Sequence, residues 1–205
     1  MGFYRNRLLP RLQDLAMSRG DLRAVRARVC QGLHGDVVEI GFGTGINADF
    51  YPPEVAKLIA IEPSALCMRL AGPRIARTST PVELAGLTGE KLELPSDSFD
   101  AVLSTWTLCT IPDVDAALAE VHRVLRPGGE FHFVEHGHAP DPKFAAWQQR
   151  IEPAWKRVAG GCHVTRPIAD LIERAGFGID SLETYYREGE PKIFGYNFEG
   201  IARKA

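Results

Sequence analysis

Short apolar runs alternate along the chain with stretches in which apolar residues recur at helical spacing. Runs such as residues 58–61 contain apolar residues alone, which is typical of strands buried on both faces of a sheet. We therefore predict strands over residues 37–40, 58–61, 82–84, 101–103 and 131–134. The spacing between and after them predicts helices over residues 45–50, 64–77, 113–126, 143–159 and 166–175.

The helix predicted over residues 113–126 has the clearest ends. Acidic residues occupy its first turn and arginines its last turn, as the helix dipole favours. Pro127, Gly128 and Gly129 follow, and we interpret them as the stop that separates this helix from the fifth strand.

The C-terminal part of the chain changes character. Two runs rich in aromatic and β-branched residues, 179–186 and 193–203, predict an antiparallel pair of strands. Together with the alternation of strands and helices before them, they predict an α/β fold with a doubly wound, seven-stranded and mostly parallel sheet that ends in an antiparallel hairpin.

The N-terminal segment is basic and helical. Leu8, Leu12 and Leu15 recur at helical spacing over residues 3–17, and a second helix is predicted over about 21–31. Residues 1–30 contain seven Arg and two Asp, a balance of +5 within a chain whose net charge is −2. This segment forms either a solvated helix face or a weak contact with an anionic partner such as a membrane surface.

The composition is that of one globular domain, which we assign to residues 1–205. The chain is 45% hydrophobic and 24% charged, which excludes an intrinsically disordered protein. It contains no apolar run of about 18 residues, which excludes a spanning helix from the sequence pattern. Arginines interrupt the start where a signal peptide would be apolar, and the four Cys form no CxxC pair, so we expect a cytoplasmic protein with reduced thiols.

A glycine-rich loop follows the first predicted strand. Gly41, Gly43 and Gly45 form a GxGxG pattern at a strand-to-helix turn, where a ligand can approach the backbone closely. The dinucleotide pattern GxGxxG would need glycine at position 46, which is Ile46, so an NAD-linked oxidoreductase is disfavoured. Glu62 ends the second strand, where a carboxylate can accept hydrogen bonds from both ribose hydroxyls.

These motifs resemble those of the class I S-adenosylmethionine-dependent methyltransferases, in particular the type 11 branch that acts on small molecules. The resemblance rests on residues 37–45, 61–64, 94–100 and 125–129, which occur in the family's order. Within that branch, residues 133–136, Trp147 with its two following glutamines, 161–162, 165–166 and 195–196 look like the methyltransferase-like 7 thiol S-methyltransferases.

The resemblance implies that S-adenosyl-L-methionine is the cofactor and suggests which residues hold it. The amino-acid end of the cofactor would meet Glu39, Gly41, Gly43, Gly45 and Asn47. Glu62 would hold the ribose, and the adenine would meet Pro63 and either Gly89 or Glu90. Ser104, Thr105 and Trp106 would face the methionine part and the methyl group. Residues 1–31 would form a helical lid or cap, and Tyr4, Trp147 and Cys162 would belong to the substrate pocket.

His136 is our candidate for a catalytic base. It follows the fifth strand at the carboxyl edge of the sheet, and an unperturbed imidazole titrates near neutrality. The alternative is a structural histidine, because a thiol acceptor is partly ionised near neutral pH and needs little help from a base. His132 and His138 suggest a metal cluster with His136, but their spacing is not telling and we predict no metal site. Cys162 and His163 are interpreted as pocket wall.

The predicted function is methyl transfer from S-adenosylmethionine to a small, apolar acceptor, with a thiol sulfur favoured. The alternatives are N-methylation of a phospholipid headgroup amine and a module that binds the cofactor without turnover. Nucleic acid is not expected, because the pI is about 6.3 and the residues after the fourth strand, Ser104 to Thr107, lack the pattern of base-methylating enzymes. The oligomeric state is left open.

Overall fold

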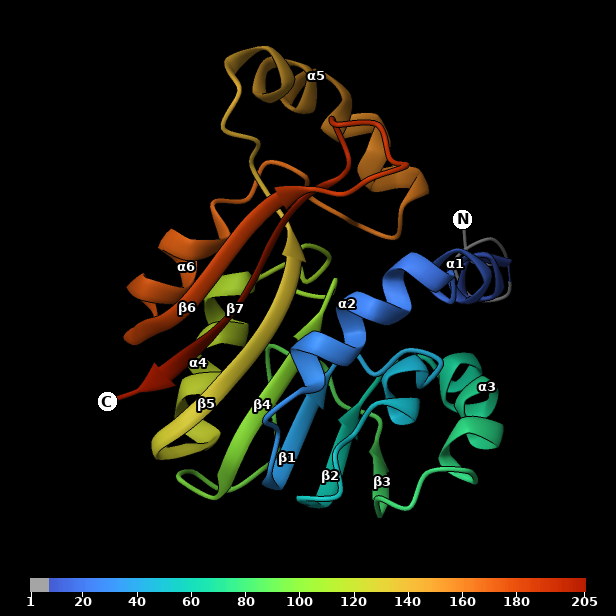
Figure 1. Cartoon of the computed structure of the whole chain (residues 1–205), viewed down its shortest axis with the longest axis vertical. Helices are drawn as coiled ribbons and strands as arrows, with labels where there is room; N and C mark the ends of the chain where they lie inside the picture. The colour runs from blue at the N-terminus through green and yellow to red at the C-terminus, as the bar shows by residue number, and fades with distance from the viewer. Residues whose placement is uncertain (1–7) are drawn as a thin grey trace.

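A seven-stranded sheet runs through the molecule, with helices on both of its faces (Figure 1). The computed structural model describes residues 8–205. The strands are β1 (Gly35–Ile40), β2 (Val55–Ile61), β3 (Val82–Ala85), β4 (Phe99–Thr105), β5 (Leu125–His136), β6 (Phe177–Tyr186) and β7 (Tyr196–Lys204). The helices are α1 (Leu9–Met17), α2 (Gly20–Cys30), α3 (Ala65–Ile75), α4 (Val114–Val124), α5 (Pro142–Val158) and α6 (Ile168–Arg174), with a 3₁₀ helix η2 (Ile46–Asp49).

The strand order is β3-β2-β1-β4-β5-β7-β6. Strands β1 to β5 pair in parallel, whereas β7 pairs antiparallel with both β5 and β6. The predicted fold class is therefore confirmed. The chain order reverses between β1 and β4, and open α/β sheets bind ligands outside the carboxyl ends of the strands at such a point.

Each face of the sheet carries its own apolar core. Val38, Val102 and Phe131 belong to the core that α4 and α6 cover. Val37 and Leu58 belong to the opposite core, to which α2 contributes Leu22 and Val25 and α3 contributes Ala71. Neighbouring residues of β1 thus enter different cores, which explains why its sequence is a nearly continuous apolar run.

Side-chain caps explain where three of the helices begin. The Oγ of Ser64 accepts from the backbone N–H of Cys67 at 3.3 Å, and the carboxylate of Asp113 accepts from the N–H of Ala116 at 3.0 Å. Asp141 does the same before α5. These residues satisfy backbone donors that the first helical turn leaves unpaired.

The prediction that residues 127–129 separate the helix over 113–126 from the fifth strand is wrong. The helix ends at Val124, and Pro127, Gly128 and Gly129 lie inside β5 rather than before it. Leu125 already pairs with Phe99, and the register shifts before the regular β4–β5 pairing resumes. Gly128 has a φ of +79°, so the segment forms a strand irregularity that glycine tolerates.

Other element boundaries also differ from the sequence prediction. Residues 46–49 form a 3₁₀ helix instead of the α-helix predicted over 45–50. The last strand begins at Tyr196 rather than at residue 193. Tyr4 lies outside the described residues. Among the residues that the structure describes, no helix has the length and apolarity needed to cross a membrane.

A test of the β6–β7 pairing uses two glycines. At Gly200 in β7, an added Cβ would overlap the carbonyl oxygen of Ser181 and lie 3.0 Å from the ring of Phe133. We expect Gly200→Ala to lower the free energy of unfolding by about 1–3 kcal/mol, as overpacking does. At Gly178 in β6 an added Cβ meets no heavy atom within 4 Å, so Gly178→Ala should leave stability unchanged or raise it. Urea unfolding of both variants distinguishes them, and equal losses would contradict this packing.

Candidate functional site

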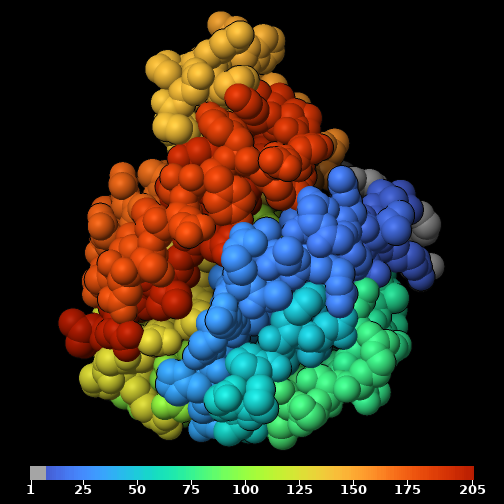
Figure 2. All heavy atoms as spheres, in the orientation of Figure 1, coloured from blue at the N-terminus to red at the C-terminus, as the bar shows by residue number. Residues whose placement is uncertain are grey.

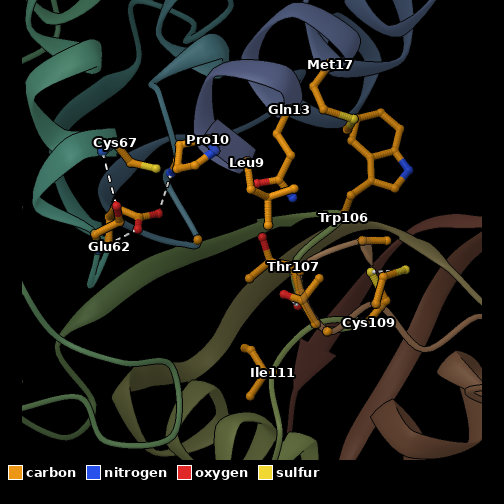
Figure 3. A pocket seen from close by; sticks show the side chains of 18 of the residues that line it. Leu9, Pro10, Gln13, Met17, Glu62, Cys67, Trp106, Thr107, Cys109 and Ile111 are labelled. Carbon is orange, nitrogen blue, oxygen red and sulfur yellow. Dashed lines mark hydrogen bonds between the residues drawn. The ribbon is translucent and has the colours of Figure 1, made fainter. Parts of the chain in front are cut away.

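One cavity of about 1440 Å³ lies at the carboxyl edge of the sheet, lined by α1, the glycine loop and the loops after β2, β4 and α5. Figure 3 shows Glu62 at one side of it and Trp106, Thr107, Cys109 and Ile111 at the other. Pockets for one small ligand measure about 300–1,000 Å³. This cavity therefore has room for a cofactor together with a second small molecule.

The glycine loop has a backbone that requires glycine at each of its three positions. Gly41, Gly43 and Gly45 have φ angles of +69°, +58° and +75°, in the left-handed region. At Gly41, an added Cβ would also overlap the side chain of Thr107. The loop can therefore lie close to the segment that follows β4, and this brings both into the wall of one cavity.

Glu39 and Asn47 stand behind the glycine loop rather than in the cavity wall. The carboxylate of Glu39 accepts from Asn47 Nδ2 at 2.9 Å and from the hydroxyl of Tyr51. Burial raises the pKa of Glu39 to about 7, although these two hydrogen bonds and the charge of Arg26 act in the opposite direction. Both residues therefore support the loop from behind, and their direct contact with the cofactor stays a prediction.

Arg26 of α2 is a buried cation that connects three segments. Its Nη1 donates to Asn47 Oδ1 at 2.7 Å and to Thr105 Oγ1 at 3.0 Å, and its guanidinium lies 4.9 Å from the ring centroid of Trp106. Burial lowers its pKa to about 10, so it remains charged at neutral pH. Arg26 is one of the seven arginines of the basic N-terminal segment, and no local sequence pattern distinguishes a buried Arg from the exposed ones around it.

Glu62 lies where β2 ends, between the glycine loop and α3. Its two carboxylate oxygens accept from the backbone N–H groups of Gly43 at 2.9 Å and Ser64 at 2.7 Å. Burial raises its pKa, and the two backbone hydrogen bonds oppose that shift. An ionised carboxylate has about four acceptor positions, so two backbone bonds leave capacity for the hydroxyls of a ligand in the cavity.

A second buried carboxylate, Glu135, fixes the loop that follows β4. Glu135 accepts from the Oγ of Ser104 at 2.7 Å and from the backbone N–H groups of Thr107 at 3.0 Å and Cys109 at 3.2 Å. Burial raises its pKa, and these hydrogen bonds oppose the shift. The loop carries Trp106 with a φ of +50° into the cavity wall. Ser104 therefore supports the loop and does not line the cavity.

Helix α1 is attached to the glycine loop. Asp14 accepts from the Oγ of Thr44 at 2.5 Å and from Arg74 of α3 at 2.8 Å. Leu9 and Gln13 of α1 also lie against Gly160, after α5. In Figure 2 the α1–α2 segment, in blue, lies between the orange-red C-terminal part of the chain and the cyan and green residues of β2 and α3. This position agrees with a cap, and its movement as a lid stays a prediction.

The far end of the cavity brings two cysteines and a histidine together. Cys109 Sγ and Cys162 Sγ are 3.6 Å apart, and Cys162 Sγ is 3.9 Å from Nδ1 of His136. The hydrogen bond with Cys109, and next His136, lower the pKa of Cys162, whereas the same sulfur contact and burial raise the pKa of Cys109. All three side chains line the cavity.

Most of the predicted site residues fall into two groups. Those that line the cavity are Gly41, Gly43, Glu62, Pro63, Gly89, Thr105, Trp106, His136 and Cys162. Those that support it from behind are Glu39, Gly45, Asn47 and Ser104. Glu90 is not among the lining residues, so Gly89 is the member of that pair at the site.

The prediction that Trp147 lines the substrate pocket is wrong. Trp147 lies on α5, which projects from the top of the molecule in Figures 1 and 2, and its side chain is 48% exposed. The guanidinium of Arg150 lies over its ring at 5.7 Å. The aromatic residue that α5 contributes to the cavity is Trp155, which stacks on Phe194 at 4.0 Å between ring centroids.

The histidines at 132, 136 and 138 do not form a cluster with one another. His132 is buried in mid-strand, where its ring nitrogens lie 2.9 Å from the carbonyl of Val29 and 3.1 Å from Glu130. His138 lines a separate small pocket near Pro167. The partners of His136 are the two cysteines, which come from distant parts of the chain.

Comparison with known proteins places these features in a family. Residues 38–133 match the model of a family described as "Methyltransferase domain". The chain is 35% identical over 172 residues to thiol S-methyltransferase TMT1A of Homo sapiens, covering 78% of this chain and 69% of that protein. It is 36% identical over 151 residues to thiol S-methyltransferase TMT1B of Rattus norvegicus, covering 72% of this chain and 62% of that protein.

The fold is also that of solved methyltransferases. The N-methyltransferase NodS from Bradyrhizobium japonicum, in complex with S-adenosyl-L-homocysteine, matches with a TM-score of 0.70 at 15% identity, covering 95% of this chain and 90% of that one. At this identity the likeness concerns the fold.

The role of Glu39 can be tested by the pH dependence of stability. Its folded-state pKa of about 7 lies above its ordinary value of 4.5, so its contribution to stability is full below pH 4.5 and is lost as the pH rises through 7. Between these limits we expect the wild type to lose about 3 kcal/mol more unfolding free energy than Glu39→Gln. Urea unfolding from about pH 5 to 8 measures both slopes. Parallel slopes would show that Glu39 is ionised throughout.

Proposed function

The chain belongs to the family of class I S-adenosylmethionine-dependent methyltransferases, and we propose that it transfers the methyl group of S-adenosylmethionine to the thiol sulfur of a small, apolar acceptor. The observation that carries the proposal is that one cavity joins two kinds of wall. One end offers backbone and carboxylate groups suited to a nucleoside. The other end offers apolar, aromatic and sulfur-containing side chains.

The residues at the first end fit the cofactor. Glu62 keeps acceptor capacity for the ribose hydroxyls while the N–H groups of Gly43 and Ser64 orient it. Pro63 and Gly89 line the neighbouring wall. At Gly89 an added Cβ would lie 2.8 Å from Ile111 and 2.9 Å from Ile40, so this wall is already close-packed. A planar base would meet a fixed surface there.

The residues at the second end favour an apolar acceptor. Trp106 and Trp155 line this part of the cavity. The indole Nε1 of Trp106 donates to Asn197 Oδ1 at 2.9 Å, so its polar atom is satisfied and the ring is held in place. Rigid aromatic walls bind an apolar molecule by removing its surface from water.

The chain's own contribution to the reaction is positioning and exclusion of water. When bound, S-adenosylmethionine would supply an activated methyl group for the acceptor sulfur, and Glu62 with the glycine loop would hold its nucleoside end. Glu135 holds the loop that carries Trp106, and α1 covers the glycine loop through Asp14. Fixed geometry of this kind supplies a large part of the rate of a two-substrate reaction.

The alternative acceptor, a phospholipid headgroup amine, has less support from the charges. In the described part of the basic segment, Arg28 donates to Glu199 at 2.9 and 2.7 Å, and Arg23 lies 3.2 Å from Asp49. Arg26 is buried. Much of the positive charge is thus engaged within the molecule, which weakens the case for an anionic surface as partner. The weak membrane contact stays a prediction.

Variants of Glu62 test the cofactor end of the site. Glu62→Ala removes the carboxylate that would accept from the ribose, and we expect the binding free energy of S-adenosylmethionine to weaken by about 1.5–3 kcal/mol. Glu90→Ala is the matched control, because Glu90 does not line the cavity and should bind with wild-type affinity. Isothermal titration calorimetry measures both, and thermal melting confirms that both fold. Equal affinities would remove Glu62 from the site.

The acceptor class is tested by competition among methyl acceptors. We expect the wild-type protein with labelled S-adenosylmethionine to methylate thiophenol and short alkyl thiols, in preference to phenol, aniline and phosphatidylethanolamine vesicles. Mass spectrometry of the products identifies the methylated atom. Preference for the vesicle amine would overturn the thiol proposal in favour of the lipid alternative. Tight binding without any methylated product would favour a module that binds the cofactor without turnover.

A further inference from the structure

Three side chains of the kinds that ligate metals converge at the sulfur end of the cavity from separate parts of the chain. Cys109 follows β4, His136 ends β5, and Cys162 follows α5. One ligand atom from each of them lies within 4.8 Å of the other two. Cys109 and Cys162 are buried and His136 is half-buried, so the cluster faces the cavity rather than open solvent.

Two of the three ligand separations are close to those of a tetrahedral zinc site. Zinc bonds of about 2.3 Å to sulfur and about 2.0–2.1 Å to nitrogen place two sulfur ligands about 3.8 Å apart, and a sulfur and a nitrogen about 3.6 Å apart. The two sulfur atoms are 3.6 Å apart here, and Cys162 Sγ is 3.9 Å from His136 Nδ1. The third separation, between Cys109 Sγ and the ligand nitrogen of His136, is within 4.8 Å. The imidazole has to move toward Cys109 for this separation to reach the zinc-site value.

We propose that Cys109, His136 and Cys162 bind one zinc ion, and that the fourth ligand position of this ion takes the sulfur of the acceptor thiol. The proposal deepens the proposed function and rests on it for the identity of the fourth ligand. A site with three protein ligands and one open position is the arrangement of catalytic rather than structural zinc.

The surroundings hold the ligands in place. The backbone N–H of Cys109 donates to buried Glu135 at 3.2 Å, and its carbonyl accepts from the N–H of His163 at 2.7 Å. Arg166 donates to the carbonyl of Ile111 at 2.7 Å and so secures the same loop. Outer contacts of this kind orient the ligands of metal sites.

A second observation points to a charged sulfur at this position. The indole Nε1 of Trp155 is buried with no conventional hydrogen bond among the described residues, and the group on which it acts is the sulfur of Cys162. A buried N–H donor favours an acceptor that carries negative charge. A metal-bound Cys162 thiolate, or the sulfur of a bound acceptor, would give this donor an anionic acceptor.

In the proposed chemistry, the zinc ion binds the acceptor thiol as a thiolate. The acceptor thiol displaces water from zinc, its sulfur keeps the electron pair that becomes the zinc–sulfur bond, and its proton leaves to solvent. Two cysteine thiolates and a neutral imidazole make the site electrically neutral before the acceptor binds. The methylated product is a neutral thioether, a weaker ligand than the thiolate, and it can leave. His136 then serves as a ligand, and no side chain has to act as base.

The first experiment measures how much zinc the protein binds, without any assay of activity. Purified protein is stripped with a chelator, kept reduced with a phosphine, reloaded with zinc sulfate, dialysed and analysed for bound zinc. We expect about one zinc per chain for the wild type and for Cys67→Ser, the matched control, because Cys67 lines the same cavity outside the cluster. Cys162→Ser and His136→Ala each remove one ligand, and each should weaken zinc binding by more than about 100-fold.

Cobalt substitution then tests the fourth ligand without any methyl donor. Cobalt(II) should give a thiolate-to-metal charge-transfer band that Cys162→Ser loses, and thiophenol, but not phenol, should change that band. Cobalt binding with no response to thiophenol would overturn the acceptor role of the site. Thiol methylation by protein that binds no zinc would overturn the metal site and leave the proposed function standing. A Cys109–Cys162 disulfide in place of bound zinc, seen by mass spectrometry, would also overturn the metal site.

Discussion

The site depends on one buried polar junction, in which Arg26 donates to both Asn47 and Thr105. Taking a hydrogen-bond partner away from a buried cation is costly, and this one joins the N-terminal helices, the glycine loop and the end of β4 in a single network through its Nη1. Asn47 in turn donates to Glu39, whose carboxylate is fully buried. Because the charge has to remain partnered, these segments cannot separate without a large cost. The cavity between them is therefore largely pre-formed.

Two buried carboxylates divide the cavity wall between them. Glu62 orients the end that meets the glycine loop, and Glu135 orients the end that carries Trp106 and Cys109. Each receives backbone N–H groups from a loop that follows a strand. This explains how irregular loops keep a fixed shape at the sheet edge: their backbone donors are satisfied by a side chain from the neighbouring strand rather than by water.

The features that could be predicted from the sequence are those that a local residue pattern determines. Apolar runs identified the strands, and the glycine pattern and Glu62 identified the cofactor end, because each of these signals directly follows a predicted strand. The cluster of Cys109, His136 and Cys162 was missed, since its members stand at least 26 residues apart in the sequence and meet through tertiary structure alone. Trp147 was misplaced because a helical segment can project from the fold, and nothing in its own sequence gives its direction.

The central claim is that one cavity holds the methyl donor at its carboxylate end and the acceptor at its sulfur end. A crystal structure of the protein with S-adenosylhomocysteine tests this most directly. The account predicts ribose hydroxyls on Glu62 and the homocysteine sulfur directed toward Trp106 and the Cys109–Cys162 wall. A ligand bound elsewhere, or one whose sulfur faces away from that wall, would contradict it.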